Sequence, residues 1–239
     1  MGKVHVVTGG GSGIGKAVAA MLSKEDTVII TGRNLTKLDK TAEELNATGC
    51  HIKTTTCDIS KLEDVKKLAE YAASLGEVSK VINCAGISGS MGDRETIIRI
   101  NALGTVYMNR EFYKVMNGGV ICDVASDSAH LLPNIMMPKE KDYRLILEDE
   151  NAFLKKMLKK SKVLKNESYN AQFAYMMSKR FVQWYAQNCA YKYMDTKGIR
   201  VFSVSPGFVK TPMTEKEQGI ASETMLSYSG LKRGAEPEE

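Results

Sequence analysis

A glycine-rich turn, TGGGSGIG at residues 8–15, follows the apolar run VHVV and precedes a helical pattern, KAVAAMLSK. In this order, strand, turn and helix let the backbone approach a phosphate closely. The N-terminus of the helix also offers N–H groups and partial positive charge to an anion. The turn therefore indicates an α/β fold that binds a dinucleotide, although a merely tight βα turn would have the same spacing.

The rest of the chain alternates short β-rich runs with helical patterns. Further strands are expected at 27–31, 51–57, 78–86, 119–126 and 199–207, and helices at 35–48, 61–75, 94–116 and about 170–195. Strands that alternate with helices predict right-handed βαβ units. We therefore expect a single Rossmann-type domain over residues 1–239, with a doubly wound parallel sheet.

Residues 130–170 interrupt this alternation. The segment begins with LLPNIMMP, which is apolar and broken by two prolines, and continues with a helical pattern rich in charges of both signs. A segment of this length between a strand and a helix is unusual and often functional. We expect an inserted helical lid that is mobile without substrate, because a long charged segment buries little apolar surface. The alternative is an insertion that simply packs onto the domain.

The composition limits the class of protein. The chain has 43% apolar residues, enough for one sizeable core, and its net charge of +5 is not concentrated in an arm. We therefore expect a solvated surface, and we rank nucleic-acid binding through the lysine-rich run at 153–165 lower. The five cysteines lack a CxxC pair, so we expect reduced buried thiols and no metal site. No signal peptide or membrane span is visible, so a cytoplasmic protein without membrane contact is expected.

The end of the second strand, TGRN, bears on the choice of dinucleotide. An NAD site usually has an acid there, which binds the ribose 2′-OH. Gly32 occupies that position and Arg33 follows. An arginine can bind a 2′-phosphate with two hydrogen bonds, whereas an acid would repel it. NADP(H) is therefore favoured over NAD(H), unless Arg33 is an ordinary exposed loop residue.

Seven motifs, in order along nearly the whole chain, resemble those of the short-chain dehydrogenase/reductase family. TGGGSGIG is similar to TGxxxGxG, CDIS to the adenine-contacting Asp motif, NCAG to NNAG, and NALG to the active-site Asn motif. DVASDSA, AYMMSK and SVSPGFVKTPM resemble the catalytic Ser segment, YxxxK and the PG motif. The resemblance implies an NAD(P)-dependent oxidoreductase that acts on a carbonyl or secondary alcohol and forms a homodimer or homotetramer.

The same resemblance implies a role for individual residues. Tyr175 would exchange the proton, Lys179 would favour its phenolate and bind the nicotinamide ribose, Ser126 would hold the substrate oxygen, and Asn101 would support a water-linked proton path. The implied cofactor-binding residues are Thr8, Gly9, Ser12, Gly13, Ile14, Gly15, Arg33, Asn34, Asp58, Ile59, Asn83, Ala85, Gly86, Tyr175, Lys179, Pro206, Gly207, Val209 and Thr211. A catalytically silent NADP(H)-sensing regulator would not need the catalytic residues together.

Three pairs have the Tyr-x-x-x-Lys spacing that places both side chains on one helix face: Tyr175/Lys179, Tyr193/Lys197 and Tyr228/Lys232. The spacing alone does not decide among them, because lysine is abundant in the chain. Tyr175/Lys179 lies after the fifth strand on the helix that leads into the PG motif, whereas Tyr193/Lys197 lies at the far end of that helix and Tyr228/Lys232 follows the sixth strand. The other two pairs are therefore expected to be coincidences.

The chain departs from the family pattern in two places. The insertion at 130–170 separates Ser126 from Tyr175, as in a bacterial 3α-hydroxysteroid dehydrogenase/carbonyl reductase subgroup. This favours a bulky apolar substrate such as a hydroxysteroid or bile acid, with a general aldehyde/ketone or 3-oxoacyl reductase as the alternative. The second departure is the ending, GLKRGAEPEE, which in the family introduces a helix and a seventh strand, so we expect a final strand to be missing.

The residues that could line a substrate pocket come from the insertion and from two helices. We expect the helix at 211–228 to flank the pocket together with the insertion. The candidates for an adaptable apolar wall are Leu131, Leu132, Ile135, Met136, Met137, Met176 and Met213. The alternative is that these side chains only pack the insertion onto the domain.

Overall fold

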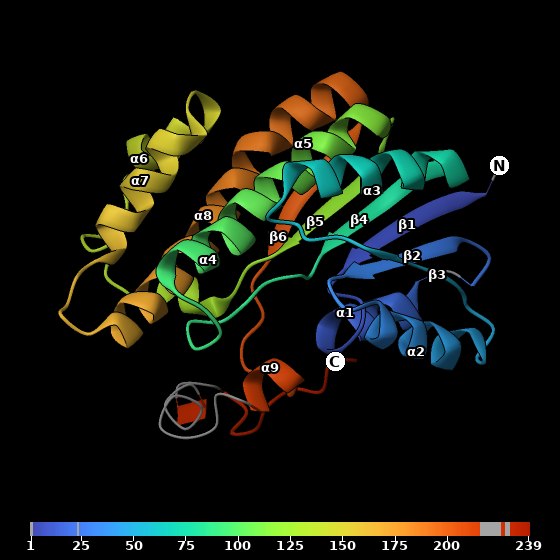
Figure 1. The fold of residues 1–239 in the computed structure, drawn as a ribbon, viewed down its shortest axis with the longest axis horizontal. Helices are drawn as coiled ribbons and strands as arrows, with labels where there is room; N and C mark the ends of the chain where they lie inside the picture. The colour runs from blue at the N-terminus through green and yellow to red at the C-terminus, as the bar shows by residue number, and fades with distance from the viewer. Residues whose placement is uncertain (1, 23, 216–225, 228–229) are drawn as a thin grey trace.

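The computed structural model describes residues 2–22, 24–215, 226–227 and 230–239. Six parallel strands form one sheet with the order β3-β2-β1-β4-β5-β6 (Figure 1). The strands are β1 (Lys3–Thr8), β2 (Thr27–Gly32), β3 (His51–Thr56), β4 (Glu77–Asn83), β5 (Gly119–Val124) and β6 (Ile199–Val204). The strand order reverses between β1 and β4, and a crevice for a ligand forms at the carboxyl ends of such strands. The predicted doubly wound α/β fold is confirmed.

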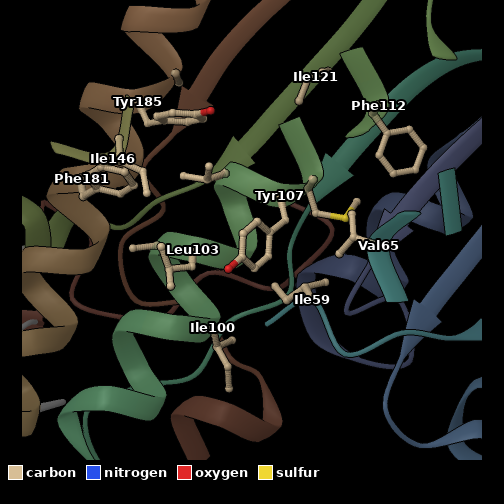
Figure 2. Close-up of a cluster of buried hydrophobic side chains, with 14 of the residues drawn as sticks. Ile59, Val65, Ile100, Leu103, Tyr107, Phe112, Ile121, Ile146, Phe181 and Tyr185 are labelled. Atoms are coloured by element: carbon tan, nitrogen blue, oxygen red, sulfur yellow. The ribbon is translucent and has the colours of Figure 1, made fainter. Parts of the chain in front are cut away.

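Helices cover both faces of the sheet (Figure 1). One face carries α1 (Gly13–Met21) and α2 (Leu35–Asn46), and the other carries α3 (Leu62–Leu75), α5 (Gly104–Val115) and α8 (Glu167–Lys197). Successive side chains of a strand point to opposite faces, so Val6 and Val7 of β1 belong to separate buried clusters. The larger cluster lies under α3, α5 and α8, where Figure 2 shows Phe112 and Ile121 among its members.

The longest helix, α8, has clear signals at both ends. Asn166 is the N-cap residue, and its side chain accepts hydrogen bonds from the backbone N–H groups of Ser168 and Tyr169. Gly198 ends the helix with φ of +65°, a conformation that glycine adopts without steric cost. These two caps fix the helix that carries Tyr175 and Lys179.

The helical pattern at 94–116 is not one regular helix. It consists of α4 (Arg94–Ile98), a π-helical stretch (Arg99–Leu103) and α5. A π-helical turn inserts an extra residue into an α-helix and is often found at functional sites. Asn101 lies in the middle of this stretch.

The insertion folds into α6 (Glu140–Arg144), a 3₁₀ turn (Leu145–Leu147) and α7 (Glu150–Ser161). Figure 1 shows α6 and α7, in yellow, beside α8 and away from β1, β2 and β3. Phe153 and Met157 are fully buried, and the Phe153 ring centroid is 4.7 Å from that of Phe181 on α8. Ile146 of the insertion and Phe181 belong to the same buried cluster, which Figure 2 shows. The expectation that the segment buries little apolar surface is therefore wrong, because its helical part shares the domain core.

The last described helix is α9 (Pro212–Glu215). Most of the helix expected at 211–228, together with Tyr228 of the third Tyr/Lys pair, lies outside the described residues. Among the helices that the structure describes, none combines the length and apolar character required to cross a membrane.

Candidate active site

The glycine turn places backbone close to the start of α1. Gly13 has φ of +51°, and a Cβ on Gly15 would be only 2.5 Å from the carbonyl oxygen of Gly9. Ser12 is the N-cap residue, yet its side chain makes no capping hydrogen bond. Instead, Ser12 Oγ accepts a hydrogen bond from Lys37 Nζ at 2.8 Å. The first N–H groups of α1 therefore have no side-chain cap from Ser12, which suits an anion at this end of the helix.

A pocket lies beyond the ends of β1, β2 and β3. Thr8 Oγ1 accepts a hydrogen bond from the N–H of Ala85 at 3.0 Å, which joins the end of β1 to the NCAG turn. Arg33 is exposed at the rim of the pocket. The lining residues are Thr8, Gly9, Thr31, Gly32, Arg33, Cys57, Asp58, Ile59, Ala85, Gly86, Ile87 and Ile100.

Two further pockets continue from this one. The first is lined by Gly9, Ser12, Gly13, Ile14, Gly15, Lys37, Cys84, Ala85, Gly86, Met91, Thr211, Pro212 and Met213. The second is lined by Ile14, Cys84, Gly86, Ile87, Val124, Ala125, Ser126, Tyr175, Lys179, Pro206, Gly207, Val209, Thr211, Met213 and Thr214. Because Gly86 lines all three pockets, they form one groove from Arg33 to Tyr175.

The last pocket brings Ser126, Tyr175 and Lys179 together. Ser126 follows β5, is 7% exposed, and its Oγ accepts a hydrogen bond from the N–H of Ser128 at 3.2 Å. Tyr175 is half-buried, and Lys179 Nζ lies 6.0 Å from the centroid of its ring. Lys179 Nζ also donates a hydrogen bond to the carbonyl oxygen of Val124 at 2.8 Å. The insertion therefore leaves Ser126 and Tyr175 in one pocket, although it separates them in sequence.

Burial sets the electrostatics of the lysine. It lowers the pKa of Lys179 to about 8, while Cys84 and Asp123 act in the opposite direction. Burial is the largest cause because a desolvated ammonium is less stable than a hydrated one. A cation close to a phenol stabilises its phenolate form, and the ammonium of Lys179 is close to the Tyr175 ring.

Asn101 lies behind the groove and does not line it. Its Oδ1 accepts a hydrogen bond from the N–H of Ile87 at 2.9 Å, and its Nδ2 donates to the carbonyl oxygen of Ile87 at 2.9 Å and to Ser178 Oγ at 3.1 Å. A Cβ on Gly86 would be 3.1 Å from Asn101 Oδ1 and 3.3 Å from Lys179 Nζ. A side chain at position 86 would therefore press on both the amide and the ammonium.

Nearly all the predicted cofactor-binding residues line the groove, and the structure places two elsewhere. Asn34 is the N-cap of α2, where its Oδ1 accepts a hydrogen bond from the N–H of Lys37 at 3.0 Å. Asn83 is buried below the groove and donates to Asp123 Oδ1 at 2.6 Å. Lys37 lines the groove but was missed from the sequence. Its signal is present, since it lies in the first turn of α2, which begins two residues after Arg33.

The expected apolar wall is only partly formed by the described residues. Met213 lines the catalytic pocket, whereas Met137 is buried in the core and Ile135 is 93% exposed. No described residue between 130 and 170 lines the groove. Leu131 and Met136 are also exposed, so part of the apolar loop at 131–136 faces solvent. Leu147, Val163 and Leu164 are exposed apolar residues further along the insertion.

Comparison with known proteins places the chain. Residues 3–138 match the family model described as short chain dehydrogenase, and residues 155–239 match one described as enoyl-(acyl carrier protein) reductase. The chain belongs to the short-chain dehydrogenase/reductase family. It is an NAD(P)-dependent oxidoreductase of that family, because the family model and the relatives that it matches are those of dehydrogenases and reductases.

Relatives and solved structures cover the chain almost completely. It is 28% identical to the short-chain dehydrogenase/reductase bsc3 of Alternaria brassicicola, over 95% of this chain and 80% of the relative. It is 26% identical to a cyclohexanol dehydrogenase of an Acinetobacter strain, over 99% of this chain and 84% of the relative. A structure of actinorhodin polyketide ketoreductase with NADPH has a TM-score of 0.74 and 21% identity, over 99% of this chain and 86% of that one.

Proposed function

We propose that the chain transfers hydride between NADP(H) and a bulky apolar ketone or secondary alcohol, such as a hydroxysteroid or bile acid. The observation that carries this proposal is the meeting of Ser126, Tyr175 and Lys179 in a pocket continuous with the dinucleotide groove. A purely NADP(H)-sensing protein would have no use for an acid–base pair and a hydroxyl donor at that end of the groove.

In the proposed mechanism the nicotinamide, when bound, supplies or accepts the hydride, and the protein handles the proton. Tyr175 donates the proton to the carbonyl oxygen during reduction and removes it during oxidation. Lys179 lowers the energy of the phenolate, because its ammonium is close to the Tyr175 ring. Ser126 donates a hydrogen bond to the substrate oxygen from the end of β5.

Replacement of the proton donor tests this mechanism. Tyr175→Phe should reduce turnover by at least about 100-fold, because general acid–base catalysis usually contributes that much. Binding of NADPH, followed by its fluorescence, should be nearly unchanged. Tyr193→Phe is the control, since the ring centroid of Tyr193 lies 4.4 Å from that of Tyr113 and its side chain does not line the groove. If Tyr175→Phe keeps a tenth of the wild-type rate, the assigned role is wrong.

We infer that the preference for NADP(H) comes from two cations at the ribose end of the groove. Arg33 follows β2 without an acid at Gly32, and Lys37 reaches the glycine turn through its hydrogen bond to Ser12 Oγ. Either cation could bind a 2′-phosphate. Arg33→Asp should therefore weaken NADPH binding and improve NADH binding in calorimetric titrations. Lys40→Ala is a matched control for a cation of α2 that does not line the groove. Tighter binding of NAD than of NADP by the wild type would overturn the preference.

A panel of carbonyl compounds assayed with NADPH tests the substrate class. The apolar character of Met213 and the exposed apolar loop at 131–136 support a bulky apolar substrate. The relative named as a cyclohexanol dehydrogenase supports a cyclic secondary alcohol. The second candidate is a 3-oxoacyl thioester, favoured by a relative from Thermotoga maritima that is named as a 3-oxoacyl-[acyl-carrier-protein] reductase and is 28% identical over 100% of this chain. Higher kcat/KM for acyl thioesters than for steroid ketones would replace the first candidate by the second.

A further inference from the structure

A carboxylate is buried close to the catalytic lysine. Asp123, on β5, has no exposed surface. Its Oδ1 accepts a hydrogen bond from Asn83 Nδ2 of β4 at 2.6 Å, and both of its oxygens lie 3.0 Å from Asn109 Nδ2 of α5. A buried charge is costly unless it is hydrogen-bonded and balanced by an opposite charge. The two amides supply hydrogen bonds, but neither carries a charge.

Lys179 supplies the opposite charge from α8. Its side chain is 7% exposed, and its Nζ donates to the carbonyl oxygen of Val124, the residue next to Asp123. The ammonium and the carboxylate do not form a direct ion pair. They act on each other across the buried end of β5, where the low dielectric strengthens the attraction.

The electrostatics of both groups reflect this arrangement. Burial raises the pKa of Asp123 to about 6, against the opposing effects of Asn83, Asn109 and Lys179. Each charge therefore helps to keep the other. The other titratable groups around Lys179 are the Cys84 thiol, which follows β4, and Tyr175, one turn earlier on α8. Asp127 is placed beside Ser126, whose Oγ donates to it at 3.3 Å.

Hydrogen bonding alone does not explain an acid at this position. An asparagine at 123 could accept the same bond from Asn83, and its own NH₂ could donate to a neighbouring amide oxygen. Two such oxygens, Asn83 Oδ1 and Asn109 Oδ1, are buried and have no hydrogen-bond partner in the structure. A neutral amide would satisfy this cluster at least as well as a carboxylate. The property that only the acid adds is its charge.

We propose that Asp123 is a positioning residue for the reaction, the buried counter-charge that keeps Lys179 an ammonium beside Tyr175. Loss of the carboxylate leaves the ammonium uncompensated in a desolvated site, so Lys179 releases its proton at a lower pH. The phenolate of Tyr175 then loses its stabilising cation within the working pH range. The catalytic consequence rests on the proposed function, whereas the effect on Lys179 does not.

Nitrogen-15 NMR of lysine-labelled protein without cofactor tests the first step directly, with the Lys179 signal assigned from Lys179→Met. Asp123→Asn and Asp123→Ser should both move the titration of Lys179 to lower pH by about one unit, as expected for loss of a nearby opposite charge. In Asp123→Glu, which keeps the charge, Lys179 should titrate at nearly the same pH as in the wild type. Cys122→Ser, at the neighbouring buried position of β5, should leave the titration unchanged. An unchanged titration in both neutral variants would overturn the proposal.

A reciprocal measurement covers the case in which the neutral variants do not fold. Carbon-13 NMR of the Asp123 carboxyl should show its titration at higher pH in Lys179→Met than in the wild type, because the opposite charge is gone. No change there would equally contradict the pairing. Both titrations can be measured even if the wild type reduces no carbonyl compound. That result would refute the proposed function and leave the pairing of Asp123 with Lys179 to be decided by the titrations.

The pH profile of carbonyl reduction tests the second step. In Asp123→Asn the alkaline limb of kcat/KM should move to lower pH by the same amount as the titration of Lys179, because the active form contains the ammonium. A merely structural role for Asp123 would lower the rate at every pH without moving the limb. A shifted Lys179 titration with an unmoved limb would therefore overturn the catalytic part of the proposal.

Discussion

The insertion offers the sharpest test of how this chain is held together. Phe153 lies on α7, has no exposed surface, and packs its ring against Phe181 of the catalytic helix. Phe153→Ala removes a buried ring and leaves a cavity, which costs about 3–5 kcal/mol in well-packed cores. For a domain of this size each kcal/mol lowers Tm by about 2–4 °C, so a loss of about 10 °C is expected.

The only tryptophan in the sequence makes the assay specific. Trp184 lies on α8, with its ring centroid 5.5 Å from that of Tyr143 in the insertion and 5.8 Å from that of Phe181. Its fluorescence therefore reports whether the insertion is docked on α8, while far-UV circular dichroism reports the whole domain. If the insertion is part of the core, urea unfolding followed by both signals should give coincident transitions.

Leu147→Ala is the matched control, because this side chain belongs to the same insertion but is 53% exposed. It should change the free energy of unfolding by less than about 0.5 kcal/mol. Two results would refute the reasoning. One is a cost below about 1 kcal/mol for Phe153→Ala, and the other is an early fluorescence transition that precedes the loss of secondary structure. Either would mean that the insertion docks and undocks as a separate lid.

Three further predictions concern the loop, the pH and one glycine. Deletion of residues 132–136 should raise KM for large ketones more than for small ones, and equal changes would exclude a role in substrate selection. Burial, and to a smaller degree the positive charge of Lys80, lowers the pKa of His5 despite its hydrogen bond to Asp26. As the pH falls, the unfolded chain therefore binds a proton at His5 at a higher pH than the folded chain does. Stability should therefore fall as the pH drops below about 6.5, by at most about 1.4 kcal/mol per unit, and His5→Gln should flatten that slope in urea titrations. Gly86→Ala should lower kcat by pushing Asn101 and Lys179 apart, and a variant with the wild-type rate would show that this spacing is not critical.

The fold could be predicted from the sequence because each signal was local. The glycine turn, the short β-rich runs and the helical patterns each come from residues that are close together in the chain. Local spacing offered three Tyr/Lys pairs, because residues four apart share a helix face, and the family resemblance selected Tyr175/Lys179. Ser126 was assigned only through the family resemblance, because nothing in the local pattern shows that β5 ends beside α8.

The errors arose where long-range packing decided the outcome. The charge density of α7 suggested a solvated segment, but the helix has a buried stripe that includes Phe153 and Met157. Lys156 and Lys160 lie 3.6 Å and 3.9 Å from the buried carboxylate of Asp142, a contact between α6 and α7 that sequence spacing does not reveal. A pattern with both charges and apolar residues is compatible with a lid or with a docked helix, and only the partner surface on α8 distinguishes them.

The docking of the insertion also affects the loop at 131–136. Arg180, the residue after Lys179, contacts His130 Nδ1 at 3.1 Å and donates to Asn134 Oδ1 at 3.2 Å. The loop is therefore attached to α8 at Arg180, while α7 is attached to the same helix through Phe181. Exposed apolar side chains such as Ile135 thus lie on a turn that is hydrogen-bonded to α8, the helix that carries Tyr175. Selection of substrates by this loop would then depend on the shape of a short, anchored turn and not on closure of the whole insertion.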